Sequence, residues 1–337
     1  MTMRTGILAA LALSSLAGAA YAQSFNASGA TFPAPIYGRW FQDYKQAHPN
    51  VQINYQPNGS GSGITDLING TVDFAASDRP LTADELNRAK NPIYFPTVLG
   101  AVVIAYNLPT VKQPLKLTPD VLANIFLTKI NKWNDPAIAK LNPGAALPNE
   151  DIVLVHRSDA SGTTFVFTEY LSKISDAWKN GPGTGQSPKW PSGLGQPGNP
   201  GVAGQIKKTK NSIGYVELAY VLDPSTKGTV QAAQLQNAAG QFVTASVQSV
   251  AAAGAQATDF PVSLSNPPAS NKAAYPISTF TYLLIPSKWS DPAKKAAIVD
   301  FLKWMLTAGQ KTAPSMFYAP LPAPVVKKDQ DQIAKIQ

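Results

Sequence analysis

The order of apolar and polar positions along the chain predicts strands that alternate with amphipathic helices. The run 151–155 is apolar and rich in β-branched residues, which predicts a buried strand. The segment 164–174 that follows carries Phe and aliphatic side chains at helical spacing. This alternation is typical of an α/β fold. Further strands are expected at 51–55, 71–78 and 212–216, and further helices at 34–47, 64–68, 82–90, 118–127, 136–141, 244–255 and 292–307.

Two longer apolar stretches, 95–106 and 277–285, each predict a long central strand. We expect the first to cross from one domain to a second and the other to return. The chain is long enough for two domains of about 100–200 residues each.

The segment 181–201 has a different composition, with seven Gly and five Pro. This composition alone predicts a linker or a disordered loop. Trp190 and Leu194 nevertheless indicate that part of the segment packs against the rest of the protein.

The turn between the strand 151–155 and the helix that follows has the most distinctive chemistry. Its sequence is Arg157-Ser-Asp-Ala-Ser-Gly-Thr-Thr-Phe165. The first N–H groups of a helix lack internal partners and carry partial positive charge, and Gly162 lets a ligand approach them closely. With the hydroxyls of Ser161 and Thr163 and the donor fork of Arg157, these groups predict a site for a tetrahedral oxyanion. Taken alone, the turn also fits an ordinary helix cap, with Asp159 or Ser161 capping and Arg157 on the surface.

Three other turns have related features. Thr31 and Phe32 present backbone N–H groups at the start of a predicted helix. Ser60 lies in a Gly/Ser turn that matches neither a Walker A loop nor a G-x-G-x-x-G motif. Asp78 ends a predicted strand, where α/β folds place side chains that face ligands. Each turn also has a simpler interpretation. The first fits a plain helix cap, the second a flexible connection, and the third a turn aspartate paired with Arg79.

The first 22 residues have the features of a signal peptide. Arg4 precedes a mostly apolar stretch, and Ala20-Tyr-Ala22 is an A-x-A cleavage signal. The stretch is too short and too rich in small residues for a membrane span. We expect cleavage after Ala22 and export of the mature chain. The chain has no cysteine for a lipid anchor, which favours free diffusion in a bacterial periplasm.

Composition and missing motifs argue against several other functions. The formal net charge is +8, but Lys and Arg do not cluster as expected for a nucleic-acid surface. With no Cys and only His48 and His156, a transition-metal site is not expected. No G-x-S-x-G elbow is present, and the charge of Arg157 disfavours the protonated His156 that a catalytic triad requires. We therefore expect no enzyme, no metal, no cofactor and no nucleic-acid partner.

One known family combines the stretches 29–37, 71–78, 95–98, 141–144, 157–167, the Trp190-Pro region with Gly198-Asn199, and 213–217. The chain resembles the phosphate-binding proteins of Pst-type ABC phosphate transporters, which are type II periplasmic binding proteins. This resemblance implies that 181–201 is an ordered loop, while the stretch from about 220 to 273 does not clearly match.

The resemblance also implies a set of phosphate ligands. Asp159 would hold Arg157 in place through an ion pair. Arg79 stands where the family is expected to have a small neutral residue, and a pairing with Asp78 would alter the charge of that carboxylate. The implied phosphate ligands are Thr31, Phe32, Ser60, Asp78, Arg157, Ser161, Gly162 and Thr163.

The fold implied by the resemblance is a two-lobed α/β periplasmic binding protein, with the ligand cleft between lobes that two crossing strands join. Residues 23–104 and 278–337 would form lobe one, and 105–277 lobe two. The implied function is high-affinity binding of inorganic phosphate by a periplasmic monomer, which delivers it to the membrane permease of an ABC phosphate importer. Three alternatives stay open: a binding protein for sulfate or another tetrahedral oxyanion, a phosphoester hydrolase, and an interaction or adhesion protein on the same scaffold.

Overall fold

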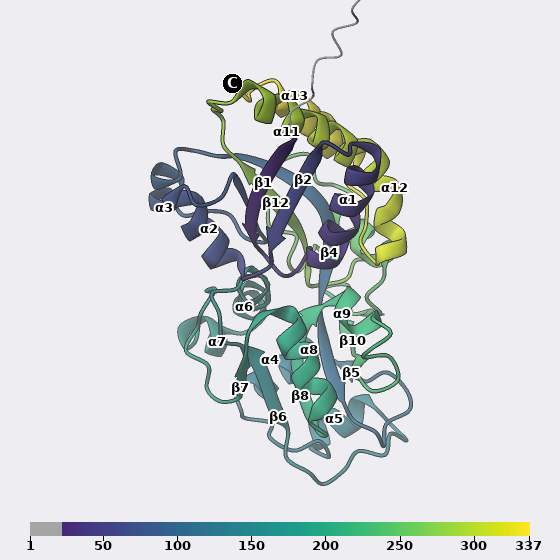
Figure 1. Ribbon diagram of the computed structural model, residues 1–337. Helices are drawn as coiled ribbons and strands as arrows, with labels where there is room; N and C mark the ends of the chain where they lie inside the picture. The colour runs from purple at the N-terminus through teal and green to yellow at the C-terminus, as the bar shows by residue number, and fades with distance from the viewer. Residues whose placement is uncertain (1–21) are drawn as a thin grey trace, which may run out of the picture.

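The computed structural model describes residues 22–337 and shows two α/β lobes, one above the other in Figure 1. The predicted signal peptide therefore lies outside the described residues, apart from its last position. Within the described range, no helix is long and apolar enough to cross a membrane.

One sheet runs through both lobes. Its strand order is β2-β1-β3-β12-β4-β8-β6-β7, and β9 also pairs with β4, while a smaller sheet has the order β11-β10-β5. The strands are β1 Gln23–Gly29, β2 Val51–Gln56, β3 Phe74–Ser77, β4 Ile93–Asn107, β5 Lys116–Leu117, β6 Val153–Arg157, β7 Leu194–Gln196, β8 Ser212–Glu217, β9 Gln231–Ala232, β10 Gln234–Gln236, β11 Phe242–Val243 and β12 Ser278–Ile285.

The long strand β4 belongs to both lobes. It pairs antiparallel with β12 as far as Ala101 and with β8 from Val102 onward. Every residue of β4 except Tyr94 is buried, as is every residue of β12, which explains why both segments are continuous apolar runs. The change of partner after Ala101 and the start of β12 at Ser278 lie close to the expected lobe boundaries. The division of the chain into 23–104 with 278–337 and 105–277 stays a prediction.

Helices surround the sheet in both lobes (Figure 1). Helix α3 begins with the predicted capping box, because Glu85 N donates to Thr82 Oγ1 and Thr82 N donates to a Glu85 carboxylate oxygen. The helices are α1 Ala34–Ala47, α2 Ser60–Asn69, α3 Ala83–Arg88, α4 Pro119–Phe126, α5 Pro136–Leu141, α6 Gly162–Ile174, α7 Asp176–Asn180, α8 Gly198–Lys208, α9 Leu218–Leu222, α10 Val247–Gly254, α11 Pro292–Trp304, α12 Gln310–Thr312 and α13 Ala323–Ile333.

Three differences between the structure and the sequence pattern bear on the site and the core. Composition predicts a linker at 181–201, but this segment contains β7 and the start of α8, and the Trp190 ring stacks on that of His156 with centroids 4.9 Å apart. The predicted helix 292–307 ends at Trp304 and continues as a π-helical turn. Strand β1 was not predicted, because its several polar residues interrupt the apolar pattern. It nevertheless pairs on both sides, with β2 and β3.

Helix α13 contains a buried carboxyl group without a partner. Asp329 is fully buried, and neither carboxylate oxygen has a hydrogen-bond partner among the described residues. Burial raises the pKa of Asp329 to about 9, although the charge of Lys328 acts in the opposite direction. At neutral pH the carboxyl is therefore protonated in the folded protein and ionised in the unfolded chain, so folding takes up a proton.

We predict that Asp329→Asn stabilises the protein at about pH 7 by roughly 1–4 kcal/mol. Because the unfolded carboxyl ionises near pH 4, the destabilising effect of Asp329 grows as pH rises above about 4, and the advantage of Asn should vanish below that pH. Chemical denaturation at both pH values measures the difference. Asp331→Asn, an exposed neighbour on α13, is the control. Equal stability of wild type and Asp329→Asn at pH 7 would contradict the prediction.

Candidate functional site

The turn between β6 and α6 in one lobe meets the start of α2 and the end of β3 in the other. Gly61 N at the start of α2 donates to Ala160 O across this boundary, over 2.9 Å. A Cβ atom added to Gly162 would lie 2.3 Å from Ser60 Oγ and 2.8 Å from Asp78 Cβ. The two lobes therefore approach so closely at Gly162 that only glycine fits there.

Arg157, at the end of β6, is buried and has one unsatisfied donor nitrogen. Its Nε and Nη2 donate to the two carboxylate oxygens of Asp159 over 2.7 and 2.5 Å. Nη1 is also buried but has no hydrogen-bond partner within residues 22–337. A buried charged donor without an acceptor is costly, so Nη1 marks a place for an acceptor that the chain does not provide. The interpretation of Arg157 as a surface residue is wrong.

Asp159 fixes the orientation of the guanidinium. Its Oδ1 also accepts a hydrogen bond from Gly198 N, at the start of α8, over 3.0 Å. Burial alone would raise the pKa of Asp159, but the hydrogen bonds and charge of Arg157 outweigh it and hold that pKa below its usual value. The Arg157–Asp159 pair is thus ionised and has no net charge. The two hydrogen bonds to Asp159 fix the plane of the guanidinium and with it the direction of the remaining donor, Nη1.

The start of α6 adds further donors next to Arg157. Ser161 is the N-cap, and its Oγ accepts a hydrogen bond from Thr164 N over 3.0 Å, as in an ordinary cap. Gly162 and Thr163 occupy the first two helical positions, whose N–H groups have no acceptor inside the helix. Phe32 lies beside the start of α1, its buried ring packs against Gly100, and its backbone O accepts a hydrogen bond from Tyr318 Oη over 2.7 Å.

Asp78 lies at the end of β3 and is the acidic group of the site. Its Oδ1 accepts from Thr281 Oγ1 over 2.8 Å, and its Oδ2 accepts from Thr163 Oγ1 over 3.3 Å across the lobe boundary. Burial raises its pKa to about 7, while the Thr281 hydrogen bond and the charge of Arg157 act in the opposite direction. Asp78 therefore changes protonation near neutral pH.

The expected pairing of Asp78 with Arg79 is wrong. The guanidinium of Arg79 forms an ion pair with Glu85, the capping residue of α3, with Nη2 2.7 Å from Oε1. The charge of Asp78 is therefore not compensated by its neighbour in the sequence.

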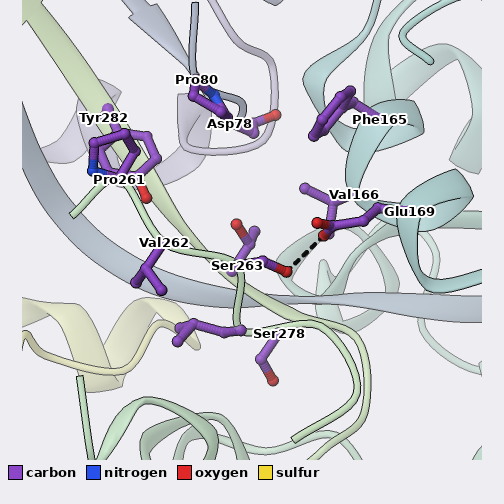
Figure 2. A pocket seen from close by; sticks show the side chains of 12 residues that line it. Asp78, Pro80, Phe165, Val166, Glu169, Pro261, Val262, Ser263, Ser278 and Tyr282 are labelled. Carbon is purple, nitrogen blue, oxygen red and sulfur yellow. Dashed lines mark hydrogen bonds between the residues drawn. The ribbon is translucent and has the colours of Figure 1, made fainter. Parts of the chain in front are cut away.

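A small cavity of about 100 Å³ borders Asp78 at the boundary between the lobes. Figure 2 shows Asp78 and Pro80 on one side of it and Phe165, Val166 and Glu169 of α6 on the other. Ser263 Oγ donates to Glu169 Oε2 over 2.7 Å beside this cavity. Asp78 is itself buried, and this burial removes water from its carboxyl group and raises the pKa.

Asn199 links the hydroxyl groups of the two lobes. Its backbone N and Nδ2 both donate to Thr31 Oγ1, over 3.0 and 2.9 Å, and Nδ2 also donates to Thr163 Oγ1 over 3.0 Å. Both lone pairs of the Thr31 hydroxyl are then occupied, so its proton is left to donate elsewhere. Asn199 thereby turns Thr31 into a donor.

The structure brings all eight residues that the resemblance implied to the boundary between the lobes, and their role as ligands stays a prediction. Sequence reasoning missed Asn199 and Thr281 as site side chains. Asn199 lies in the Gly- and Pro-rich segment, and its role depends on contacts with distant residues. For Thr281, the only signal was a hydroxyl inside a fully buried strand.

No group of His, Cys, Asp or Glu in the described range could hold a metal ion. His156 is occupied elsewhere, because its ring stacks on Trp190 and its Nδ1 bonds to Arg157 O over 2.9 Å. The arrangement is suited to holding a small tetrahedral anion between many donors and one carboxyl group.

Comparison with known proteins agrees with this geometry. The family model described as "PBP superfamily domain" matches residues 15–308. The chain is 45% identical over 307 residues to the phosphate-binding protein PstS of Xylella fastidiosa, which covers 89% of this chain and 82% of that protein. It is 44% identical over 338 residues to the PstS of Pasteurella multocida, covering 98% and 96% respectively. The chain belongs to the PstS family of phosphate-binding proteins.

A solved structure extends the comparison of this PstS-family chain to the fold. A high-affinity periplasmic phosphate-binding protein, solved with phosphate bound, superposes with a TM-score of 0.71 at 21% identity. The match covers 92% of this chain and 94% of that chain. The expected two-lobed periplasmic binding protein fold is confirmed.

We predict that Gly162→Ala keeps the lobes of this PstS-family protein apart. The added Cβ cannot fit against Ser60 and Asp78. Small-angle scattering should show a larger radius of gyration than for wild type, and the variant should bind oxyanions at least about tenfold more weakly. Gly204→Ala is the matched control, because a Cβ there meets nothing within 4 Å. A compact, tightly binding Gly162→Ala variant would show that the lobes do not need this approach.

Proposed function

We propose that this protein binds inorganic phosphate with high affinity between its lobes and delivers it to the membrane permease of an ABC phosphate importer. The observation that carries the proposal is the buried Nη1 of Arg157, which has no acceptor in the described chain. Arg157 ends β6, and the next helix along the chain is α6. The names of the PstS relatives support phosphate as the anion.

In this proposal, phosphate oxygens accept hydrogen bonds from the Arg157 guanidinium, from helix-start N–H groups and from hydroxyls of both lobes. The start of α6 favours an anion because its first N–H groups have no acceptor inside the helix and carry partial positive charge. Asp78 accepts a hydrogen bond from protonated phosphate, and Asp159 orients Arg157. The proposed phosphate ligands are Thr31, Phe32, Ser60, Asp78, Arg157, Ser161, Gly162 and Thr163.

We further propose that the protein is a periplasmic monomer, exported with cleavage after Ala22. The A-x-A signal at 20–22 supports the cleavage site. The names of the relatives describe binding proteins, which supports transport rather than catalysis. The structural contacts of His156 also support this view, because they occupy the ring that a serine hydrolase would need.

We predict that Arg157→Ala weakens phosphate binding at least about tenfold, because charge-assisted hydrogen bonds contribute about 1.5–3 kcal/mol. Arg157→Lys should restore only part of the affinity, since an ammonium group cannot engage both Asp159 and phosphate as a planar fork does. Calorimetric titration of protein stripped of bound ligand measures both effects.

The control is Arg39→Ala, which removes an exposed arginine that pairs with Asp43. Unchanged phosphate affinity in Arg157→Ala would contradict the site. Turnover of a chromogenic phosphoester by wild type would favour a hydrolase, and stronger binding of sulfate than of phosphate would favour a sulfate-binding protein.

Asp78 gives the site a means to reject sulfate. An ionised carboxylate only accepts hydrogen bonds, and phosphate near neutral pH still has a proton to donate. Sulfate has none, so its oxygen would face the carboxylate oxygen without a hydrogen between them. When Asp78 is protonated, its O–H can donate to sulfate and the repulsion disappears.

Because the pKa of Asp78 is raised to about 7, we predict that sulfate affinity rises at least about tenfold between about pH 8.5 and 5.5. Sulfate itself does not titrate in this range, so the change reports Asp78. Asp78→Asn should bind sulfate at both pH values and lose the pH dependence. Sulfate titrations of the two proteins at each pH measure this, and equal rejection of sulfate by both would assign selectivity to other residues.

A further inference from the structure

Arg79 is a buried cation that the phosphate site does not use. Its side chain is 5% exposed, and its Nη1 and Nη2 donate to Glu85 over 2.8 and 2.7 Å. Nη1 also donates to Pro80 O over 2.8 Å. Glu85 is in turn held by the capping box of α3, and the hydrogen bonds from Arg79 lower its pKa. The guanidinium is thus fixed within lobe one.

The Nε–H group of Arg79 donates to a residue of the other lobe. Its Nε donates to Gln186 Oε1 over 2.9 Å. Gln186 lies in the Gly- and Pro-rich segment, and its backbone O accepts from Ser161 N over 3.0 Å. Gln186 therefore contacts lobe one through its side chain and the anion-facing turn of lobe two through its backbone.

We propose that Arg79 and Gln186 form a latch across the cleft that holds the closed form and slows the release of the bound anion. This proposal rests on the proposed function. Glu85 already orders the guanidinium of Arg79. On closure Arg79 therefore gains the Nε–Gln186 hydrogen bond with little further loss of side-chain entropy.

The latch is expected to change the rate at which the anion dissociates. Neither Arg79 nor Gln186 is among the proposed phosphate ligands, so losing their bond changes how long the closed form lasts and not which anion it holds. An interaction formed only on closure affects the dissociation rate more than the association rate. The discrimination against sulfate should therefore be unaffected.

The test is the release of radiolabelled phosphate into an excess of unlabelled phosphate. Gln186→Ala should release phosphate about tenfold faster than wild type, with a nearly unchanged association rate. Gln186→Glu keeps an acceptor opposite Nε and should restore slow release. Gln205→Ala is the matched control, because Gln205 bonds to Thr209 within lobe two. Arg79→Lys, which keeps a cation beside Glu85, should behave like Gln186→Ala.

Wild-type release kinetics in a Gln186→Ala protein that binds phosphate would overturn the latch and leave the proposed function intact. If the wild type binds no phosphate, the proposed function fails, and small-angle scattering of the unliganded proteins then decides the latch. A larger radius of gyration for Gln186→Ala than for wild type and Gln205→Ala would support it, and equal values would overturn it.

Discussion

The site depends on the paired but incompletely satisfied guanidinium of Arg157. Asp159 accepts hydrogen bonds from two of its three nitrogens, and Gly198 N at the start of α8 donates to Asp159 in turn. These contacts leave Nη1 buried and without an acceptor in the described chain. The ion pair removes net charge from the site, so the position of an incoming anion is set by directed donors and not by a diffuse positive field.

The second constraint is that the donors come from two lobes that must meet closely. Gly162 allows contact with Ser60 and Asp78, and Asn199 bonds to threonine hydroxyls on both sides. The switch of β4 from one partner strand to another after Ala101 gives the two halves of the sheet a common strand near this meeting point. The sheet thus determines where the lobes join. The turns that follow its strands supply the donors and the carboxyl group that lie between the lobes.

Much of this could be predicted from local sequence patterns. The strand, turn and helix around Arg157 and the capping box at Thr82 depend on residues within a few positions of one another. The partner of Arg79 could not be predicted, because Asp78 and Glu85 are both near in sequence and only the folded α3 decides between them. Asn199 and Gln186 were missed because their segment has a linker composition, and its order comes from distant contacts such as the stacking of Trp190 on His156.

In the proposed closed form, Arg157 Nη1 and the Asp78 carboxyl group face the same anion. A crystal structure of the phosphate-saturated protein tests this most directly. We expect one phosphate between the lobes, with an oxygen within about 3 Å of Nη1 and a second oxygen at the same distance from Asp78. A phosphate bound elsewhere, or a cleft in which Nη1 stays without an anion at saturating phosphate, would contradict it.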